Sequence, residues 1–399
     1  MNYILFDDYS RIDLLPFTFT RPVCEIRSGI LTIREKWEKF LTSKTSTITE
    51  KYLSQKFPII FEEDNFFING KICPDQNLIL KIGELKSGQK LMQENTLIAF
   101  RLKGKNNESL NFENFNQQIS FFEKIKYSYN FLSINFIWDI FKLNDELITR
   151  DYFLLTKERK SAKISESNSI LGNEIFVEEG ASAECAIINT KTGPVYLGKN
   201  SVIMEGSMIR GPFALCEEST LKMGAKIYGP TTVGPYSKIG GEINKFVIFG
   251  YSNKAHDGFL GNSVIGEWCN LGADTNNSNL KNNYAEVKIW SYKSNSFVNS
   301  GLTFCGLFMG DHSKCGINTM FNTGTVVGVS ANIFGDGFPR NFIPSFSWGG
   351  AAGFTSFTLV KALEVAEKVM SRRSITLNPS EKEILEYLFN NSISQSKKG

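Results

Sequence analysis

Apolar residues recur at every sixth position through the middle of the chain. The longest run has eight members without a miss: Leu197, Ile203, Ile209, Leu215, Leu221, Ile227, Val233 and Ile239. A second run with the same step consists of Met309, Cys315, Phe321, Val327 and Ile333. Two shorter runs are Leu171, Val177 and Ala183, and Phe259, Ile265 and Leu271. A period of six fits neither the 3.6-residue period of a helix nor the two-residue period of an alternating strand.

This period predicts a chain that makes a short strand, a tight corner and then the next strand. Three such hexads close one triangular coil of about 18 residues, and each inward aliphatic residue stacks about 4.8 Å above its counterpart in the next coil. A small residue often follows the apolar one, as in Leu197-Gly198 and Val233-Gly234, and glycine supplies the positive φ of a tight corner. The pattern therefore predicts a parallel β-helix over residues 171–337. The alternative is a chance spacing in an ordinary β-sandwich, which requires eight coincidences in a row.

The first 160 residues lack the hexads and mix strand and helix patterns. Predicted strands cover residues 3–6, 65–68 and 95–100, and predicted helices cover the region of Ile30, Ile33, Trp37 and Phe40 and segments 136–143 and 145–155. Strands that alternate with helices favour an α/β layer structure. The sequence thus divides into an α/β domain (1–160), a β-helix domain (168–345) and a C-terminal part (346–399).

Two helices are expected after the hexads stop near Pro344. Leu359, Leu363, Ala366 and Met370 have amphipathic helical spacing. A second helix is predicted to begin at Ser380, with Glu383 three residues later as a capping box. These helices are expected to cap the open end of the β-helix, which otherwise exposes unpaired strand edges. Residues 394–399 are expected to form a disordered tail.

Composition narrows the class of protein. The chain of 399 residues is 42% apolar and 21% charged, which is typical of a globular protein, and its formal net charge of +3 gives no reason to expect a nucleic-acid or membrane partner. The seven cysteines are scattered and form no CxxC pair, which favours reduced thiols in the cytoplasm over disulfides or a zinc site. The N-terminus has no basic region before an apolar stretch, and no segment approaches about 18 apolar residues, so we expect a cytoplasmic protein without membrane spans.

One segment inside the repeats carries a more specific pattern. Residues 252–279 have the sequence SNKAHDGFLGNSVIGEWCNLGADTNNSN. They resemble the acetyltransferase half of the bacterial bifunctional enzymes that acetylate glucosamine 1-phosphate and then uridylylate it. The family pattern S-x-x-x-H-x-x-Y-L-G-(D/N), followed by N-x-G-A-G and N-Y elements, is matched without a gap by Ser252, His256, Leu260-Gly261-Asn262, Asn270-Leu271-Gly272-Ala273 and Asn279. The resemblance implies left-handed coils, as in other hexapeptide-repeat transferases, and a homotrimer with active sites between subunits.

The resemblance also implies roles for particular residues. His256 matches the general base, Asn270 the residue that contacts the sugar, and Asn279 a residue near acetyl-CoA and the base. Lys226 falls where the family has a phosphate-binding arginine. Phe259 takes the place of the family's tyrosine, which removes a hydroxyl contact.

The histidine count supports this chemistry. N-acyl transfer needs a base that removes a proton from the attacking amine, and an imidazole suits that role near neutral pH. The chain has two histidines, His256 and His312, which is too few for the three metal-binding histidines of a γ-type carbonic anhydrase on the same scaffold. The alternatives are a structural corner residue for His256 and a solvated corner for His312. The Asn-rich segment 276–283 is either an arm that reaches a neighbouring subunit's site or a polar loop without a ligand.

The N-terminus resembles the nucleotidyltransferase half of the same family less closely. That half opens with G-x-G-(T/S)-R and then P-L-T-x-x-x-P-K, whose backbone and cations hold the nucleotide phosphates. The corresponding residues 5–23, LFDDYSRIDLLPFTFTRPV, have no glycine, and Val23 stands at the lysine position. Arg11 and Arg21 are candidates for phosphate contacts, with ordinary buried or surface ion pairs as the alternative. Asp7 and Asp8 at the end of the first strand are minor candidates for Mg²⁺, because acidic residues at a strand end are more often caps. Lys71 stands where the family has its metal-binding aspartate.

The whole chain is identified as a divergent member of the bifunctional N-acetylglucosamine-1-phosphate uridylyltransferase/glucosamine-1-phosphate acetyltransferase family. This implies transfer of a nucleotidyl group from an NTP to a sugar 1-phosphate with Mg²⁺, and transfer of an acetyl or other acyl group from acyl-CoA to an amino-sugar phosphate. Two alternatives stay open. One is an acyltransferase with a degenerate nucleotidyltransferase domain, and the other is a non-catalytic regulatory or oligomerisation scaffold.

Overall fold

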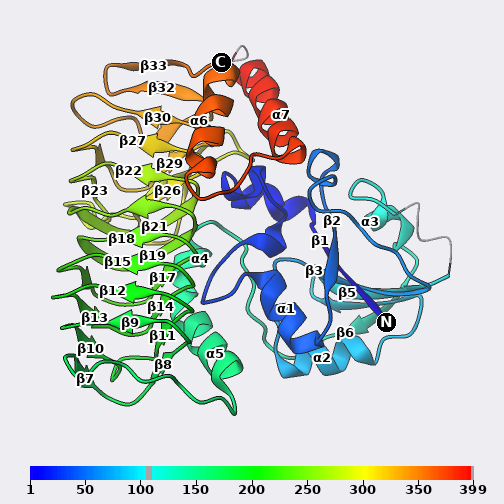
Figure 1. The fold of residues 1–399 in the computed structure, drawn as a ribbon. Coiled ribbons are helices and arrows are strands. Elements are labelled where there is room, and N and C mark those ends of the chain that lie inside the picture. Colours follow the sequence, from blue (N-terminus) through cyan, green and yellow to red (C-terminus); the bar gives the residue numbers. More distant parts are fainter. Residues whose placement is uncertain (105–109, 397–399) are drawn as a thin grey trace.

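The computed structural model describes residues 1–104 and 110–396. A tall stack of triangular coils stands beside a smaller α/β domain, and two C-terminal helices pack along the last coils on the side of that domain (Figure 1). This arrangement confirms the predicted fold class, an α/β domain followed by a left-handed parallel β-helix with C-terminal helices. No helix in the described ranges is both long and apolar enough to cross a membrane.

A mixed sheet of six strands forms the centre of the α/β domain. Its strands are β1 (Asn2–Phe6), β2 (Thr45–Ile48), β3 (Asp64–Asn69), β4 (Gln89–Gln93), β5 (Thr96–Lys103) and β6 (Glu123–Lys126), in the order β2-β1-β3-β5-β4-β6. β1 is parallel to both of its neighbours, and β5 is antiparallel to β3 and β4. The strands predicted at residues 3–6, 65–68 and 95–100 are β1, β3 and β5. Both faces of the sheet are buried, because Leu5 and Ile68 belong to one apolar cluster and Ile4 and Phe67 to another.

Short helices cover this sheet and connect it to the β-helix. They are η1 (Tyr9–Leu14), η2 (Phe17–Phe19), η3 (Val23–Glu25), α1 (Ile33–Leu41), η4 (Lys51–Leu53), α2 (Gln76–Gly83) and α3 (Phe115–Gln118). α1 begins with a capping box, in which Thr32 Oγ1 accepts from the Glu35 amide at 3.1 Å and the Glu35 carboxylate accepts from the Thr32 amide at 2.6 Å. α4 (Asp139–Lys142) and α5 (Asn144–Thr156), predicted at 136–143 and 145–155, pack on strands of the β-helix.

The β-helix has three faces, and the chain visits them in turn. Face one consists of β7 (Ser169–Leu171), β10 (Ile187–Asn189), β13 (Met208–Arg210), β16 (Lys226–Ile227) and the first halves of β19 (Glu242–Gly250) and β21 (Phe259–Glu267). Face two consists of β8 (Ile175–Val177), β11 (Val195–Leu197), β14 (Phe213–Leu215), β17 (Thr231–Val233), the second halves of β19 and β21, β26 (Leu307–Met309), β29 (Thr325–Val327) and β31 (Phe342–Ile343). Face three consists of β9 (Ser182–Ala183), β12 (Val202–Ile203), β15 (Thr220–Leu221), β18 (Lys238–Ile239), β20 (Asn253–Lys254), β22 (Asn270–Leu271), β27 (Lys314–Cys315), β30 (Asn332–Ile333) and β32 (Ser347–Gly350). β23 (Asn276–Asn277) and β28 (Met320–Phe321) form a further parallel pair.

The two long runs agree with the inward positions of the coils. All members of the two long runs are buried in one apolar cluster. The short runs contain two errors. Ile170, and not Leu171, pairs with the buried Ile188, and Leu171 is 45% exposed. Leu260, and not Phe259, is the buried residue at the start of β21. Near β19 the paired residues Ile227, Ile243 and Leu260 are only 16 and 17 positions apart, so the phase shifts there.

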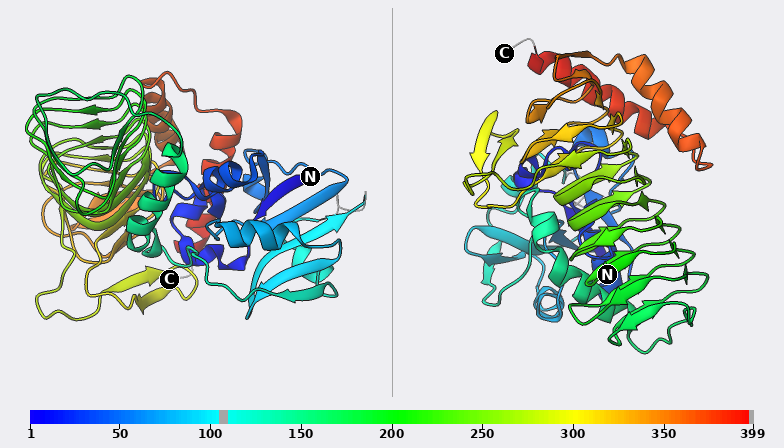
Figure 2. Two further views of the ribbon diagram at one scale, coloured as in Figure 1. Left: turned by 90° about the horizontal axis from the view of Figure 1, so that it is seen from below. Right: turned by 90° about the vertical axis from the view of Figure 1, so that its left-hand side faces the viewer.

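The Asn-rich segment opens a long insertion. Between β23 and β26 the chain forms an antiparallel hairpin of β24 (Lys288–Ser291) and β25 (Ser296–Asn299). The hairpin projects from the stack on the side of the α/β domain, as Figure 2 shows. Lys293 at its tip pairs with Asp13 at 3.0 Å, and Tyr292 meets Phe19 edge-on at 5.1 Å. The insertion therefore contacts the α/β domain of its own chain.

The C-terminal part contains the expected helices with different starts. After Pro344, β32 still pairs with β30, and β33 (Gly353–Ser356) returns antiparallel to β32. α6 (Leu359–Ser371) and α7 (Pro379–Ser396) follow. The predicted capping box at Ser380 is wrong, because Asn378 is the cap. Its side chain accepts from the Glu381 amide at 2.9 Å, and Pro379 occupies the first helical position, where it needs no amide. Of the expected disordered tail, residues 394–396 belong to α7 and 397–399 lie outside the described residues.

Candidate functional site

His256 lies on the corner that follows β20, where the chain passes from face three to face one. Its side chain is exposed. Gly258 in the same turn has a φ of 111°, and a Cβ there would lie 2.2 Å from the Thr275 carbonyl oxygen, so a side chain cannot fit. The Phe259 amide donates to Asn276 Oδ1 at 2.7 Å. The following coil therefore fixes the end of the turn that carries His256.

A lysine inside the β-helix fixes the other end of this turn. Lys254 is fully buried at the inward position of β20, where the neighbouring coils place Ile239 and Leu271. Its ammonium donates to the backbone carbonyls of His256 and of Asp257, the latter at 2.6 Å. Burial lowers the pKa of Lys254 to about 8, although the carboxylates of Asp257 and Asp274 oppose this shift. The hexad pattern does not reveal Lys254, because it follows Ile239 by 15 positions and so lies out of the six-residue phase.

Two of the expected substrate-binding residues lie on face one, next to the His256 corner. Lys226 is exposed, and it pairs in register with Glu242, which pairs with Phe259 in the next coil. Because successive coils are about 4.8 Å apart, Lys226 and Phe259 lie about 10 Å apart in one outward row. A cation, an imidazole and a partly exposed aromatic ring thus share one edge of the solenoid.

The two expected asparagines lie on either side of this edge. Asn270 is exposed on face three, in register between Asn253 and Lys314. Asn279 lies at the corner between faces one and two, and its side chain donates to Asn262 Oδ1 at 2.8 Å. Within one chain the Asn279 amide nitrogen lies beside the Phe259 ring, because both border the space next to Gly261, whereas Asn270 lies on face three.

Arg11, a predicted phosphate contact, forms ion pairs with carboxylates inside the α/β domain. Its guanidinium pairs with Asp7 at 3.3 Å and Glu50 at 3.0 Å, and it also donates to the Thr18 carbonyl. The side chain is buried. Of the two interpretations left open for Arg11, the structure shows the buried ion pair.

Arg21 has a similar role between the domains. Its guanidinium pairs with Asp311, which precedes β27, and with Glu267 at the end of β21 at 3.2 Å. The ring of Phe249 lies beneath it at 5.1 Å. Thr20 adds a hydrogen bond to the same Asp311 carboxylate at 2.6 Å. Arg21 thus ties the α/β domain to two coils of the β-helix.

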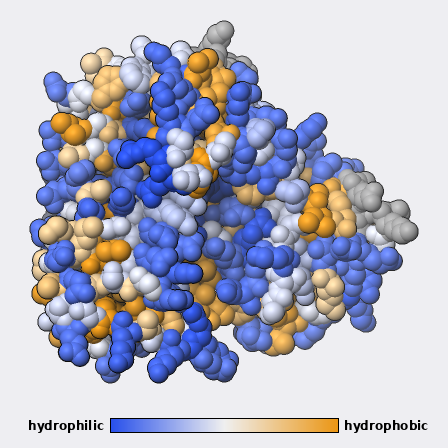
Figure 3. Space-filling model, viewed as in Figure 1, coloured by the Kyte–Doolittle hydropathy of each residue, from blue (hydrophilic) through white to orange (hydrophobic). Residues whose placement is uncertain are grey.

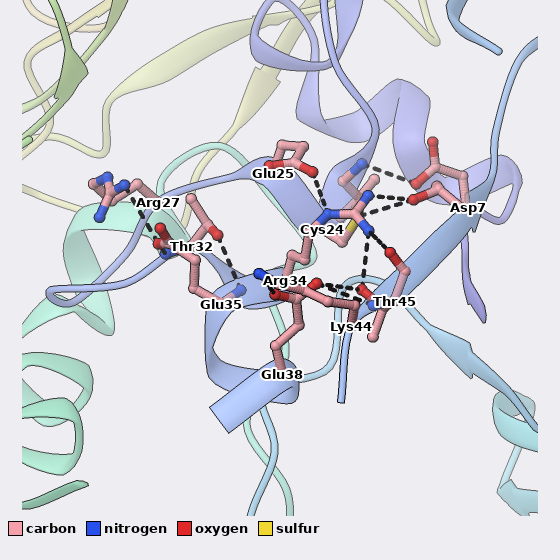
Figure 4. A network of polar contacts seen from close by, with 12 residues as sticks. Asp7, Cys24, Glu25, Arg27, Thr32, Arg34, Glu35, Glu38, Lys44 and Thr45 are labelled. Carbon is pink, nitrogen blue, oxygen red and sulfur yellow. Dashed lines mark hydrogen bonds and ion pairs between the residues drawn. The ribbon is translucent and has the colours of Figure 1, made fainter. Parts of the chain in front are cut away.

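The segment after β1 is held by internal polar contacts where the family pattern has a phosphate loop. Val23, at the position of the family's lysine, donates its amide to Asp7 Oδ1 at 2.8 Å. Arg34 of α1 pairs with Glu25 and donates to the Thr45 carbonyl at 2.9 Å (Figure 4). These contacts give the segment a fixed conformation without glycine.

The carboxylates at the end of β1 do not fit a Mg²⁺ site. Burial raises the pKa of Asp7, whose oxygens already accept from Val23, Arg11 and Thr49. Burial acts in the same direction on Asp8, but the Lys71 ammonium at 3.3 Å and hydrogen bonds from Ser10 and Asn69 outweigh it and lower the pKa of Asp8. Lys71 thus places a cation beside the oxygens that a metal would need. The described residues also contain no cluster of three or more His, Cys, Asp or Glu side chains suited to a metal.

Comparisons with known proteins agree with the family resemblance. Residues 3–160 match the family model described as sugar nucleotidyl transferase. A bifunctional sugar-1-phosphate nucleotidylyltransferase/acetyltransferase of Sulfurisphaera tokodaii is 32% identical over 146 residues, which is 32% of this chain and 36% of that protein. The bifunctional protein GlmU of Methanocaldococcus jannaschii is 26% identical over 192 residues, which is 48% of this chain and 40% of that protein. The chain therefore spans well under half the length of these curated relatives.

Two solved structures of acyltransferases resemble this chain only weakly. The polySia-specific acetyltransferase NeuO is 16% identical, with 48% of this chain and 87% of that chain covered and a TM-score of 0.29. An Arabidopsis UDP-N-acetylglucosamine acyltransferase is also 16% identical, with 59% and 92% covered and a TM-score of 0.26.

Proposed function

We propose that this protein, whose residues 3–160 match the sugar nucleotidyl transferase family, acts in nucleotide-sugar biosynthesis. Its β-helix transfers an acetyl or other acyl group from acyl-CoA to the amine of an amino-sugar phosphate, with His256 as the general base. The observation that carries this proposal is the exposed imidazole of His256 on a turn fixed from inside by Lys254. Lys226 and Phe259 on the adjacent face supply a cation for the phosphate and an apolar surface for the sugar.

The chemistry follows from these positions. The His256 imidazole accepts a proton from the attacking amine while the nitrogen forms a bond to the thioester carbonyl carbon. The tetrahedral intermediate then loses the thiolate of CoA as the C–S bond breaks, and the imidazolium returns the proton to that sulfur. The products are an amide and free CoA, and the base is regenerated. Asn270 and Asn279 stay proposed substrate contacts, which a second subunit would complete.

Nucleotidyl transfer to a sugar 1-phosphate is the second candidate activity, and the match of residues 3–160 supports it. The ion pair of Asp8 and Lys71 favours the alternative of an acyltransferase whose α/β domain has lost that activity. Purified protein incubated with amino-sugar 1-phosphates, acetyl-CoA, the four NTPs and Mg²⁺ separates the two. Acetylated sugar phosphate without pyrophosphate release supports acyl transfer alone, whereas both products support the bifunctional enzyme.

His256→Asn tests the proposed base directly. We expect the acetylation rate to fall at least about 100-fold, since general-base catalysis contributes roughly 10²–10⁴-fold. His312→Asn is the matched control, because it removes the other histidine of the chain and should leave the rate near that of the wild type at pH 7.5. Acetylation at the wild-type rate by His256→Asn would contradict the assignment.

A homotrimer is part of the proposal. Hydrophilic residues cover most of the molecular face in Figure 3, with apolar patches between them, several on the β-helix. Face one carries exposed Ile187, Met208 and Tyr228 in its outward rows (47%, 43% and 52% exposed), and apolar side chains gathered on one face favour contact with another protein surface. Light scattering should give a mass about three times 44.9 kDa, and a mass near 44.9 kDa at micromolar concentration would argue against the homotrimer.

The cytoplasmic location of the protein stays a prediction.

A further inference from the structure

A cavity of about 620 Å³ lies where the β24–β25 hairpin meets the last coils of the β-helix. Its walls combine cationic and aromatic side chains: Lys281, Lys288, Arg340, Trp290, Phe297 and Phe342. The volume is within the range of pockets that bind small molecules. Nothing in the proposed acyl-transfer chemistry uses these residues.

The aromatic side chains form one continuous wall. Trp290 of β24 stacks on Phe342 of β31 with ring centroids 4.1 Å apart and 12° between the planes. Phe297 of β25 meets Trp290 edge-on at 5.3 Å, and its ring is exposed. The exposed Phe297 ring offers a face on which a planar ring can stack, with Trp290 beside it.

The cations of the cavity are not neutralised. Lys288 and Arg340 are exposed and make no side-chain hydrogen bond or ion pair within the described residues. The Lys281 ammonium donates to the Glu286 backbone carbonyl at 2.7 Å, which leaves its charge intact. None of the residues that line the cavity has a carboxyl group. By contrast, Arg11 and Arg21 are both paired with carboxylates.

The cavity is preformed by contacts at its root. A Cβ on Gly324, which has a φ of 67°, would lie 2.5 Å from the Lys288 carbonyl oxygen, so the hairpin rests directly on that turn. The Asn341 side chain donates to the Thr323 carbonyl at 2.7 Å and holds the opposite wall. Lys293 and Asp13 anchor the hairpin tip to the α/β domain. Binding therefore needs little reordering of the chain.

We propose that this cavity binds an anionic nucleotide, with its base against Phe297 and Trp290 and its phosphates near Lys288 and Arg340. Three cations without a carboxylate partner among the described residues select an anion, and the aromatic wall selects a planar ring. Coenzyme A and a nucleoside triphosphate share this chemistry. This binding site goes beyond the proposed function. The proposed function matters here only for deciding whether coenzyme A or a nucleoside triphosphate is the natural ligand.

Isothermal titration of the full chain tests the site with three probes: coenzyme A, UTP and inorganic pyrophosphate. We expect Lys288→Ala and Arg340→Ala each to weaken binding of the better nucleotide about tenfold or more. Phe297→Ala should weaken that nucleotide but leave pyrophosphate binding unchanged. Lys199→Ala is the matched control, because Lys199 is an exposed lysine on a distant coil without a side-chain partner in the described residues. All four positions are exposed, so the variants should keep the wild-type melting temperature.

The outcomes separate the alternatives. If coenzyme A binds more tightly than UTP, the natural ligand of the cavity is the acyl donor. If UTP binds more tightly than coenzyme A, the natural ligand is a nucleotidyl substrate. Unchanged nucleotide affinity in the Lys288→Ala/Arg340→Ala double variant would overturn the site. Pyrophosphate affinity equal to that of the nucleotides, with no effect of Phe297→Ala, would overturn the assignment of a nucleotide. His256→Asn should retain nucleotide binding, so loss of acyl transfer and loss of this site are distinguishable.

Discussion

Lys254 is an unusual residue for the core of a β-helix. The adjacent inward positions on face three are Ile239 and Leu271, and Lys254 between them is as fully buried as they are. Burying an ammonium group is costly unless hydrogen bonds compensate it. The carbonyls of His256 and Asp257 provide that compensation. We therefore interpret Lys254 as a positioning residue, which holds the turn of the proposed base.

Lys254→Met tests this role, because methionine has a similar length and no charge. We expect amide hydrogen exchange in residues 255–258 to become about tenfold faster, since the two carbonyls lose their donor. The kcat of acyl transfer should fall about tenfold with KM nearly unchanged, because the base is displaced while the substrate contacts stay. Ile239→Met in the preceding coil is the control for a changed core. Wild-type exchange in that turn together with wild-type kcat would show that Lys254 has no positioning role.

His312 is a second buried titratable group, at the junction of β-helix, α7 and α/β domain. Its Nδ1 is buried and has no hydrogen-bond partner among residues 1–104 and 110–396. Burial and the nearby cations Lys314, Lys56 and Arg21 lower the pKa of His312 to about 3, against a smaller opposite effect of the Asp311 carboxylate. The imidazole is therefore neutral in the folded protein at physiological pH.

This pKa makes folding stability depend on pH. Between pH 6.5 and about 3 the unfolded chain binds a proton at His312 and the folded chain does not, so stability present above pH 6.5 is lost as the pH falls. From pH 7.5 to pH 5 this single group should cost about 2 kcal/mol. His312→Asn removes the group, and asparagine tolerates the left-handed φ of 61° at this position. Denaturant unfolding measures the free energy of unfolding at pH 7.5 and at pH 5, and its decrease between them should be about 2 kcal/mol smaller in the variant than in the wild type. Equal decreases in the two proteins would exclude His312 as the cause.

At the scale of elements, the hexads predicted the β-helix because its core is a regular physical repeat. Each inward residue meets the same kind of neighbour one coil above and below, so the period of the structure is present in the sequence. The prediction failed where the coil length changes. Coils shortened to between 15 and 17 residues around β19 and β21 shift the phase, which misplaced Phe259 and concealed Lys254, 15 positions after Ile239.

The tertiary contacts of the candidate sites were less predictable. The sequence indicated Arg11 and Arg21 as cations near a phosphate site, but their carboxylate partners include Glu50, Glu267 and Asp311, which lie 39 or more positions away. A short stretch of sequence does not predict ion pairs between residues that are so far apart along the chain. The pairing of Lys71 with Asp8 across neighbouring strands has the same character. The hairpin that forms the nucleotide cavity was also missed, because its aromatic residues pack on Phe342 of a later coil.

At the scale of the whole molecule, the α/β domain and the β-helix share one apolar core. Leu5 and Phe17 belong to the same buried cluster as Phe249, Phe308 and Val326 of the β-helix. Phe17 contacts both Phe249 and Phe308, with ring centroids 5.2 and 6.5 Å apart. Separation of the domains would expose these rings to water, at roughly 25 cal/mol for each Å² of apolar surface. We therefore expect the two domains to unfold together.

Arg21→Met tests that expectation, because Arg21 and Asp311 form a buried ion pair across the interface, with side chains only 6% and 4% exposed. Removal of one partner leaves a buried carboxylate without its cation and should lower the free energy of unfolding by about 3 kcal/mol. Since the core is shared, hydrogen exchange of the most protected amides should report the same loss in β1 and in β14. The double variant Arg21→Met/Asp311→Asn should lose less than the sum of the two single variants. A loss confined to the α/β domain would mean that the domains unfold independently and that the interface is a docking contact between two separate cores.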